Sequence, residues 1–268
     1  MAHSKTLLRL LLHGLLQQLT DAADIVEREG GVKALHDYRI VLRKLRVALR
    51  FCRRYWGKAA VEPLERQLKR EHGRTSHHRD RDVVSDVLRG IKAPAAAIDA
   101  WSALATPARP RARSTRAVAA QIDRGVAALL EREPARSEGR ERLAQRVVDA
   151  ATRRAARRAV ALDAAAPRRH AYRTALRRLR YTIDLLSAHV SKPERRFARQ
   201  VDALQRALGQ LRDLDLTRAA LPRLRRLSRL QRIELTHALE ARRSAVLRAA
   251  THAARQLAGS SVMTARRT

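Results

Sequence analysis

Two segments of the sequence place a histidine at the head of arginines that recur every three or four residues. The first series is His36, Arg39, Arg43, Arg46 and Arg50, and the second is His170, Arg173, Arg177 and Arg180. Because an α-helix turns about 100° per residue, each series forms one stripe along a helix. Arginine presents five donors in a planar fork that fits phosphate oxygens two at a time. The spacing therefore predicts binding of a polyanion.

The two stripes belong to a longer internal repeat. The segment LHDYRIVLRKLRVAL at 35–49 aligns with RHAYRTALRRLRYTI at 169–183, which also pairs Lys44 with Arg178. Further along, RDRDV at 79–83 aligns with RDLDL at 212–216, pairing Arg79 with Arg212. Two matched blocks in the same order, at nearly the same offset, indicate a duplicated unit. Pro134, Ser137 and Gly139 mark the boundary, so we expect repeats over 1–134 and 135–268.

The charge of the whole chain supports a polyanionic partner. It has 268 residues with 58 Lys and Arg, only seven of them Lys, against 26 Asp and Glu, a formal net charge of +32. Such an excess repels itself unless an anion neutralises it. Nucleic acid, polyphosphate and an anionic membrane all qualify. The plain alternative, a solvated arginine-coated surface, does not explain the excess over acids. Near the stripes we expect only Asp37 and Asp184 as acids, too few to neutralise them.

Composition and periodicity predict an all-helical fold. Glycine and proline are sparse, aromatic residues make up only 3%, and Leu, Ala and Val must build the core. The expected helices cover about 4–28, 35–56, 62–72, 77–90, 95–104, 114–132, 140–164, 168–190, 193–210, 212–220 and 223–257. The first reads as an amphipathic helix and not as a signal peptide. No stretch has the apolar length of a membrane span, so we expect a soluble, cytoplasmic chain.

Other candidate chemistry is weaker. Cys52 lies in an apolar helical pattern and is expected in the core. His77 and His78, with Asp80 and Asp82, could coordinate a metal ion. Adjacent histidines point to different faces of a helix, however, which makes a shared metal site there a weak expectation. We expect the aspartates of the repeated blocks to cap the starts of helices; they are Asp80, Asp82, Asp213 and Asp215. No metal-binding carboxylate cluster, glycine-rich phosphate loop or nucleophile motif accompanies the stripes, so we expect no enzyme, no cofactor and no metal.

The repeated blocks resemble the CHAD domain, the conserved histidine α-helical domain. Its pattern of a histidine followed by arginines and a Leu-Arg pair matches 36–46 and 170–180, and Leu204-Gln205, Leu208-Gly209 and Asp213 match its next segment. The resemblance covers about residues 3–257. It implies two four-helix bundles, related by a pseudo-twofold internal repeat, around a basic central cavity that binds inorganic polyphosphate. In the first repeat, Glu71, Thr75 and Ser76 depart from the pattern of the second.

The resemblance and the stripes together predict the ligand-binding residues. They are His36, Arg39, Arg43, Lys44, Arg46, Arg50, Arg79, His170, Arg173, Arg177, Arg178, Arg180 and Arg212. The partner would be inorganic polyphosphate, at polyphosphate granules and alongside granule-associated proteins, with weak non-specific nucleic-acid binding possible. DNA or RNA binding is the alternative function, but single-strand binders stack bases on aromatic side chains and none cluster with these stripes.

Overall fold

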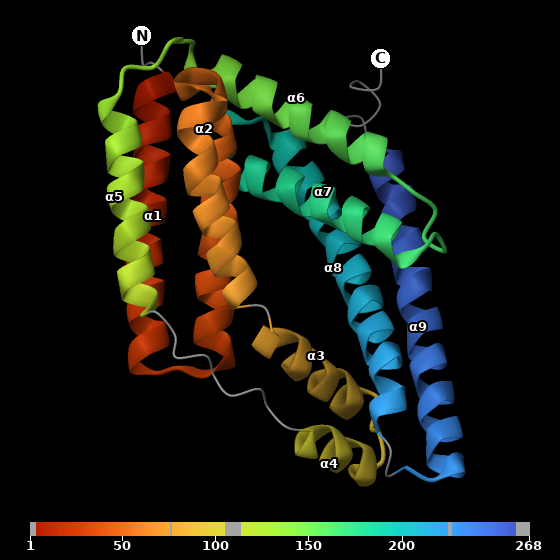
Figure 1. Ribbon diagram of the computed structural model, residues 1–268. Helices are drawn as coiled ribbons and strands as arrows, with labels where there is room; N and C mark the ends of the chain where they lie inside the picture. The colour runs from red at the N-terminus through yellow and green to blue at the C-terminus, as the bar shows by residue number, and fades with distance from the viewer. Residues whose placement is uncertain (1–3, 76, 105–113, 225–226, 261–268) are drawn as a thin grey trace. The chain divides into compact units, whose positions relative to one another are not determined.

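The computed structural model is all-helical (Figure 1). It describes residues 4–75, 77–104, 114–224 and 227–260, without the side chains of 77–81. Over these residues it has no strand, which confirms the predicted fold class. The helices are α1 (Ser4–Arg28), α2 (Gly31–Arg74), α3 (His77–Gly90), α4 (Ala95–Ala103), α5 (Thr115–Glu131), α6 (Arg140–Arg158), α7 (Ala166–Leu185), η1 (Ser187–His189), α8 (Lys192–Ala220), η2 (Leu221–Arg223) and α9 (Arg229–Ala258).

The chain divides into two compact units that interleave along the sequence. The first comprises Met1–His77, Pro110–Ala150 and Tyr181–Ser191, and the second His78–Arg109, Ala151–Arg180 and Lys192–Thr268. Helices α6 and α7 each contribute to both units. The duplicated bundles about a pseudo-twofold axis, the cavity between them and the repeat boundary near residue 134 stay predictions.

The first unit is built from α1, α2 and α5, which pack side by side (Figure 1). Leucines at helical spacing give α1 one apolar face, and Leu8, Leu12 and Leu19 are fully buried. Leu42, Leu45 and Leu49 do the same on α2. Each fully buried leucine stabilises the unit by roughly 1.5–3 kcal/mol relative to exposure. This burial fixes which face of α2 turns inward, and with it the direction of the arginine stripe beside that face.

Helix α2 is a hairpin of two arms that meet at Gly57. Gly57 has φ 81° and ψ 155°, a conformation that side-chain-bearing residues rarely adopt. The predicted helix end near Gly57 is therefore confirmed. The second arm runs antiparallel to the first, as the contacts of Arg53 with Glu65 and of Tyr38 with Glu71 require. It begins at residue 58 and not at 62 as predicted, so Pro63 lies inside the arm.

In the second unit, α8 and α9 form the most extensive contact. Our predicted helix boundary at 210–212 is wrong, because α8 continues unbroken to Ala220. Asp213 and Asp215 therefore lie within a helix and cannot cap one. Asp215 instead forms an ion pair with Arg169 of α7 and lies 3.8 Å from the Nε of Arg243. These pairings outweigh capping, since the amides near the middle of a helix already have partners.

Every aromatic residue of the chain is buried. The set is Tyr38, Phe51, Tyr55, Trp56, Trp101, Tyr172, Tyr181 and Phe197. Cys52 is also fully buried, as predicted, and burial raises the pKa of its thiol to about 12. Among the described residues, no helix combines the length and apolarity needed to cross a membrane.

Candidate anion-binding site

The stripe on α2 starts at the surface and passes inward. His36 is exposed in the second turn of the helix, whereas Arg39 is only 3% exposed. The Arg39 guanidinium donates to the backbone carbonyl of Thr75 and, at 3.1 Å, to the Thr75 hydroxyl. Arg39 thus joins the first arm of α2 to the end of the second. These contacts give Arg39 a structural role, and its place in ligand binding stays a prediction.

Two residues that depart from the repeat pattern, Glu71 and Thr75, support this stripe, and the third, Ser76, lies outside the described residues. Glu71 is 4% exposed and accepts hydrogen bonds from Tyr38 Oη at 3.1 Å and from both Arg74 Nε and Nη2, at 2.8 and 2.7 Å. A buried carboxylate needs such partners to offset its lost hydration. Burial, followed by the Glu71 charge, raises the pKa of the Tyr38 phenol. Sequence reasoning assigned Glu71 and Thr75 no role, because their partners lie 33 to 36 residues away.

The middle of the stripe carries three cations without a carboxylate partner. Over the described residues, Arg43, Lys44 and Arg46 form no ion pair, and all three are half-buried. Arg43 Nη1 lies 3.4 Å from His72 Nε2 on the second arm, and the buried Nε of Arg43 has no hydrogen-bond partner. Burial lowers the pKa of Arg46, an effect that the Glu65 charge only partly opposes. An anion seated here would supply the missing acceptors.

The far end of the stripe is compensated, contrary to our expectation. Glu65 of the second arm lies 3.8 Å from Arg50 Nε and forms a bidentate pair with Arg53. In the second unit, Asp202 lies 3.1 Å from Arg180 Nη1 and 3.4 Å from Arg206 Nε. The expectation that only Asp37 and Asp184 lie near the stripes is therefore wrong. The carboxylates come from the second arm of α2 and from α8, and the sequence of the stripe segments alone cannot show that they lie nearby.

The second stripe, on α7, is fixed by a close approach to α8. Arg173 is 8% exposed, and its guanidinium crosses α8 at Gly209. A Cβ at that glycine would lie 3.2 Å from Arg173 Nη2 and 3.3 Å from its Nε. Glycine at this position therefore lets the arginine lie flat across the neighbouring helix. The Leu208-Gly209 pair singled out in the sequence thus has a packing reason.

His170 lies among arginines from two helices. The residue as a whole is exposed, but neighbouring atoms partly desolvate its imidazole ring. This desolvation is the largest cause of the lowered pKa of His170. The charges of Arg173, Arg212 and Arg177 lower the pKa further, in that order. The structure therefore brings together four of the predicted residues, three from α7 and Arg212 from α8. Arg212 Nη1 also lies 3.3 Å from Asp213 Oδ1.

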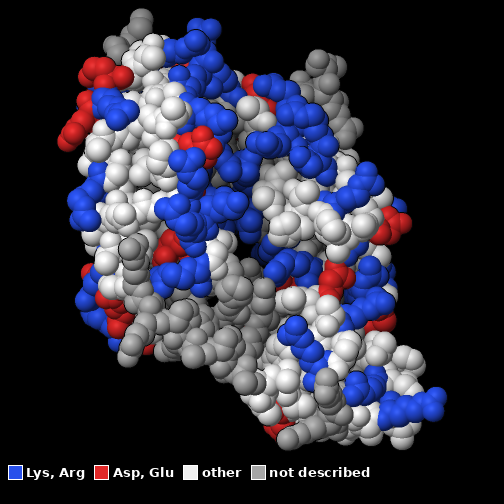
Figure 2. All heavy atoms as spheres, viewed as in Figure 1, with Lys and Arg blue, Asp and Glu red and all other residues white. Residues whose placement is uncertain are grey.

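The remaining predicted residues flank these clusters. Arg178 is half-buried on α7, in the same register as Lys44 on α2. Arg79 lies in α3, where its side chain falls outside the described residues, as do those of His77, His78 and Asp80. On the face shown in Figure 2, Lys and Arg side chains gather over α2 and, separately, over α6 and α7, where Asp and Glu are few. Within the described residues, no group of three His, Cys, Asp or Glu side chains could hold a metal ion.

The fold is all-helical, and Arg43, Lys44 and Arg46 form no ion pair among the described residues. The chain belongs to the CHAD domain family, whose model matches residues 10–222. The resemblance to the CHAD domain that the sequence analysis noted is therefore confirmed. CHAD domains are in general linked to polyphosphate binding and are in general non-catalytic.

Two solved structures resemble the chain. PptA from Streptomyces chartreusis matches 95% of this chain and 100% of its own, with a TM-score of 0.68 and 17% identity. The CHAD domain from the plant Ricinus communis matches 98% of this chain and 90% of its own, with a TM-score of 0.59 and 20% identity. At these identities the likeness concerns the fold. Comparison with curated protein sequences found no match.

Proposed function

We propose that the chain binds inorganic polyphosphate, without catalysing a reaction on it, through the cations of α2 and α7. The observation that carries the proposal is the run Arg43, Lys44 and Arg46, which has no carboxylate partner among the described residues. Half-buried cations cost stability when nothing neutralises them. A chain of phosphates, with about one negative charge per unit, would neutralise successive arginines through bidentate contacts. The cluster around His170 offers the same chemistry on α7 and α8.

The burial of all eight aromatic residues favours polyphosphate over single-stranded nucleic acid. Proteins that bind single strands without sequence preference stack bases on exposed aromatic rings, each worth about 1–3 kcal/mol. This chain has no aromatic ring available at its surface for stacking. Its arginines recognise phosphate whatever is attached to it, so nucleic acid is left with the electrostatic part of the affinity alone. The absence of exposed aromatic rings does not lower the affinity for polyphosphate, because polyphosphate has no bases to stack.

Competition between the two polymers tests this function. Labelled polyphosphate would be displaced by unlabelled polyphosphate, single-stranded DNA or duplex DNA at equal phosphate concentration. We expect polyphosphate to compete at least tenfold better than either DNA. Equal competition by DNA would mean that the chain recognises charge alone and would overturn the assignment. Incubation with Mg²⁺ and long-chain polyphosphate should release no orthophosphate above a buffer blank.

We also propose that the chain acts at polyphosphate granules. A fluorescent fusion should follow granules in phosphate-rich cells and disperse when the granules are consumed. A fusion that carries Arg43→Gln and Arg46→Gln should disperse in both conditions. Granule association that survives this change would separate localisation from polyphosphate binding.

A further inference from the structure

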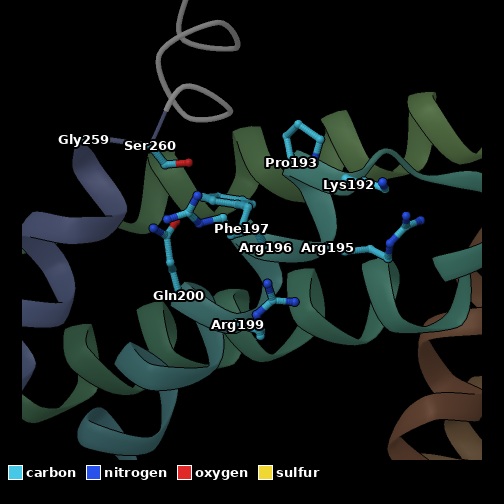
Figure 3. A pocket seen from close by; sticks show the side chains of 9 residues that line it. All are labelled: Lys192, Pro193, Arg195, Arg196, Phe197, Arg199, Gln200, Gly259 and Ser260. Atoms are coloured by element: carbon cyan, nitrogen blue, oxygen red, sulfur yellow. The ribbon is translucent and has the colours of Figure 1, made fainter.

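Two adjoining pockets, of about 700 and 470 Å³, form a groove between the first turns of α8 and the end of α9 (Figure 3). Both are lined by Arg196, Arg199, Gln200 and Gly259. From Lys192 to Ala203 the groove follows α8 for about 17 Å, at a rise of 1.5 Å per residue. None of its lining residues is a predicted polyphosphate-binding residue. The α9 side also lies beyond residues 10–222, which the family model matches.

The α8 side of the groove is cationic. Arg196 and Arg199 are exposed, lie one turn apart and form no ion pair within the described residues. Lys192 and Arg195 lie at the end of the groove away from Gly259 (Figure 3), and Arg195 already has a partner within the chain. Among the described residues that line the groove, none is an Asp or Glu. Because like charges one turn apart repel each other, carboxylates placed beside Arg196 and Arg199 would be favourable.

The α9 side of the groove presents hydrogen-bond acceptors. Helix α9 ends at Ala258, and the last carbonyls of a helix together carry about half a negative charge. The carbonyl oxygens of Arg255 and Gln256 lie 3.7 and 3.9 Å from the position that a Cβ on Gly259 would take. The half-buried Gln200 adds an amide with both donors and an acceptor. This side therefore suits donor groups and disfavours an anion.

The two different sides distinguish between anionic polymers. A phosphate chain has acceptor oxygens only, so it would meet the carbonyls of α9 with charge of the same sign. A peptide rich in Asp or Glu has carboxylates for the arginines and backbone N–H groups for the carbonyls. An extended peptide rises about 3.3 Å per residue, so about five residues would cover the groove. Pro193 and Ala203 add apolar contacts for its side-chain stems.

We propose that this groove docks an extended acidic segment of a partner protein. Successive carboxylates on one side of the segment would pair with Arg196 and Arg199, and backbone N–H groups would donate to the end of α9. The chain would then have a protein-binding surface besides its proposed polyphosphate site. This docking does not depend on polyphosphate binding, because it uses other residues.

Fluorescence anisotropy with a synthetic peptide tests the groove in the full chain. The probe is a labelled ten-residue peptide of alternating Glu and Thr, in 0.15 M salt to screen diffuse attraction. We expect saturable binding that Arg196→Gln with Arg199→Gln weakens at least tenfold. The matched control, Arg242→Gln with Arg248→Gln, removes two exposed α9 arginines that form no ion pair in the described residues, and it should leave binding within twofold. Absent binding, or equal losses in the two double variants, would overturn the proposal.

Peptides that keep the charge but lose N–H donors test the contacts with α9. Two versions of the probe carry N-methyl groups, one on the Glu nitrogens and the other on the Thr nitrogens. At least one of them should bind tenfold more weakly than the parent peptide. A labelled single-stranded DNA of equal charge should bind more weakly and should not depend on Arg196 and Arg199. Undiminished binding of both methylated peptides, or tight DNA binding through these arginines, would mean that the groove recognises charge alone, and the proposal would be wrong.

Cross-linking locates the bound peptide. A photoreactive group at its centre should modify residues within 192–203 and 255–260, as mapped by mass spectrometry. Modification confined to the stripes of α2 and α7 would place the peptide at the proposed polyphosphate site and would overturn the groove. A chain that captures the peptide in the groove but does not bind polyphosphate would support the groove and count against the proposed function alone.

Discussion

Replacing Arg43 and Arg46 by glutamine tests whether the uncompensated run on α2 is a binding site. Both residues lie on the face of α2 that meets its second arm, and neither has a carboxylate partner among the described residues. A hydrogen bond to a charged group contributes about 1.5–3 kcal/mol. At about 1.4 kcal/mol per factor of ten, each arginine should contribute roughly 10- to 100-fold in affinity for polyphosphate. The double variant should therefore lose at least 100-fold at low salt.

The same change should not destabilise the fold. Burial already disfavours the charge of Arg46 and lowers its pKa, and Arg43 and Arg46 repel each other at i and i+3. Glutamine keeps the methylene part of the arginine stem and a neutral hydrogen-bonding amide while removing the charge. We therefore expect a melting temperature equal to that of the parent or slightly higher. Lower affinity combined with unchanged or higher stability is typical of residues kept for binding.

Binding would be followed by fluorescence anisotropy with labelled polyphosphate over a range of salt concentrations. Each lost phosphate contact should reduce the slope of log K against log salt by about 0.7, the value for single-stranded polyanions. The double variant should thus lose about 1.4 from the slope. Arg242→Gln with Arg248→Gln removes the same charge from exposed positions of α9. If that control loses as much affinity and slope, binding is diffuse and the assigned site is wrong.

Three further predictions follow from the buried and clustered groups. Partial burial and neighbouring arginines lower the His170 pKa from its ordinary value, so a bound anion should raise that pKa and draw in a proton. Polyphosphate affinity should therefore rise as the pH falls through the titration range of His170, and His170→Asn should flatten this rise in a pH series of titrations. Gly209→Ala should displace the Arg173 guanidinium by a few tenths of an ångström and weaken polyphosphate binding. The control Gly14→Ala places a Cβ that meets nothing within 4 Å, so it should leave binding unchanged and raise the melting temperature by favouring the helix. Equal affinity of the two variants would contradict the packing argument. Cys52, with a thiol pKa of about 12, should resist iodoacetamide at pH 8 until the chain is unfolded in guanidinium, and mass spectrometry of the folded protein should show it unmodified.

The helical content and the stripes followed from local properties. Leu and Ala at 3.6-residue spacing predict helices whatever the rest of the chain does, so α1, α4 and α5 lie where expected. Boundaries were less predictable where a helix continues through polar residues. The RDLDL block at 212–216 reads locally like a helix start, but Thr217 Oγ1 donates to the Asp213 carbonyl inside an unbroken helix. Ion pairs with α7 and α9 give Asp215 a better role there than capping.

Which arginines keep their charge uncompensated was decided by tertiary packing. The sequence alone determined the all-helical class, the excess of positive charge and two histidine-headed stripes, because these depend on composition and helical periodicity. It could not determine that Glu65 neutralises Arg50, that Thr75 holds Arg39, or that Gly209 makes room for Arg173. Each of these contacts joins residues 15 to 36 positions apart, and only the packing of the two arms of α2, or of α7 with α8, brings them within reach.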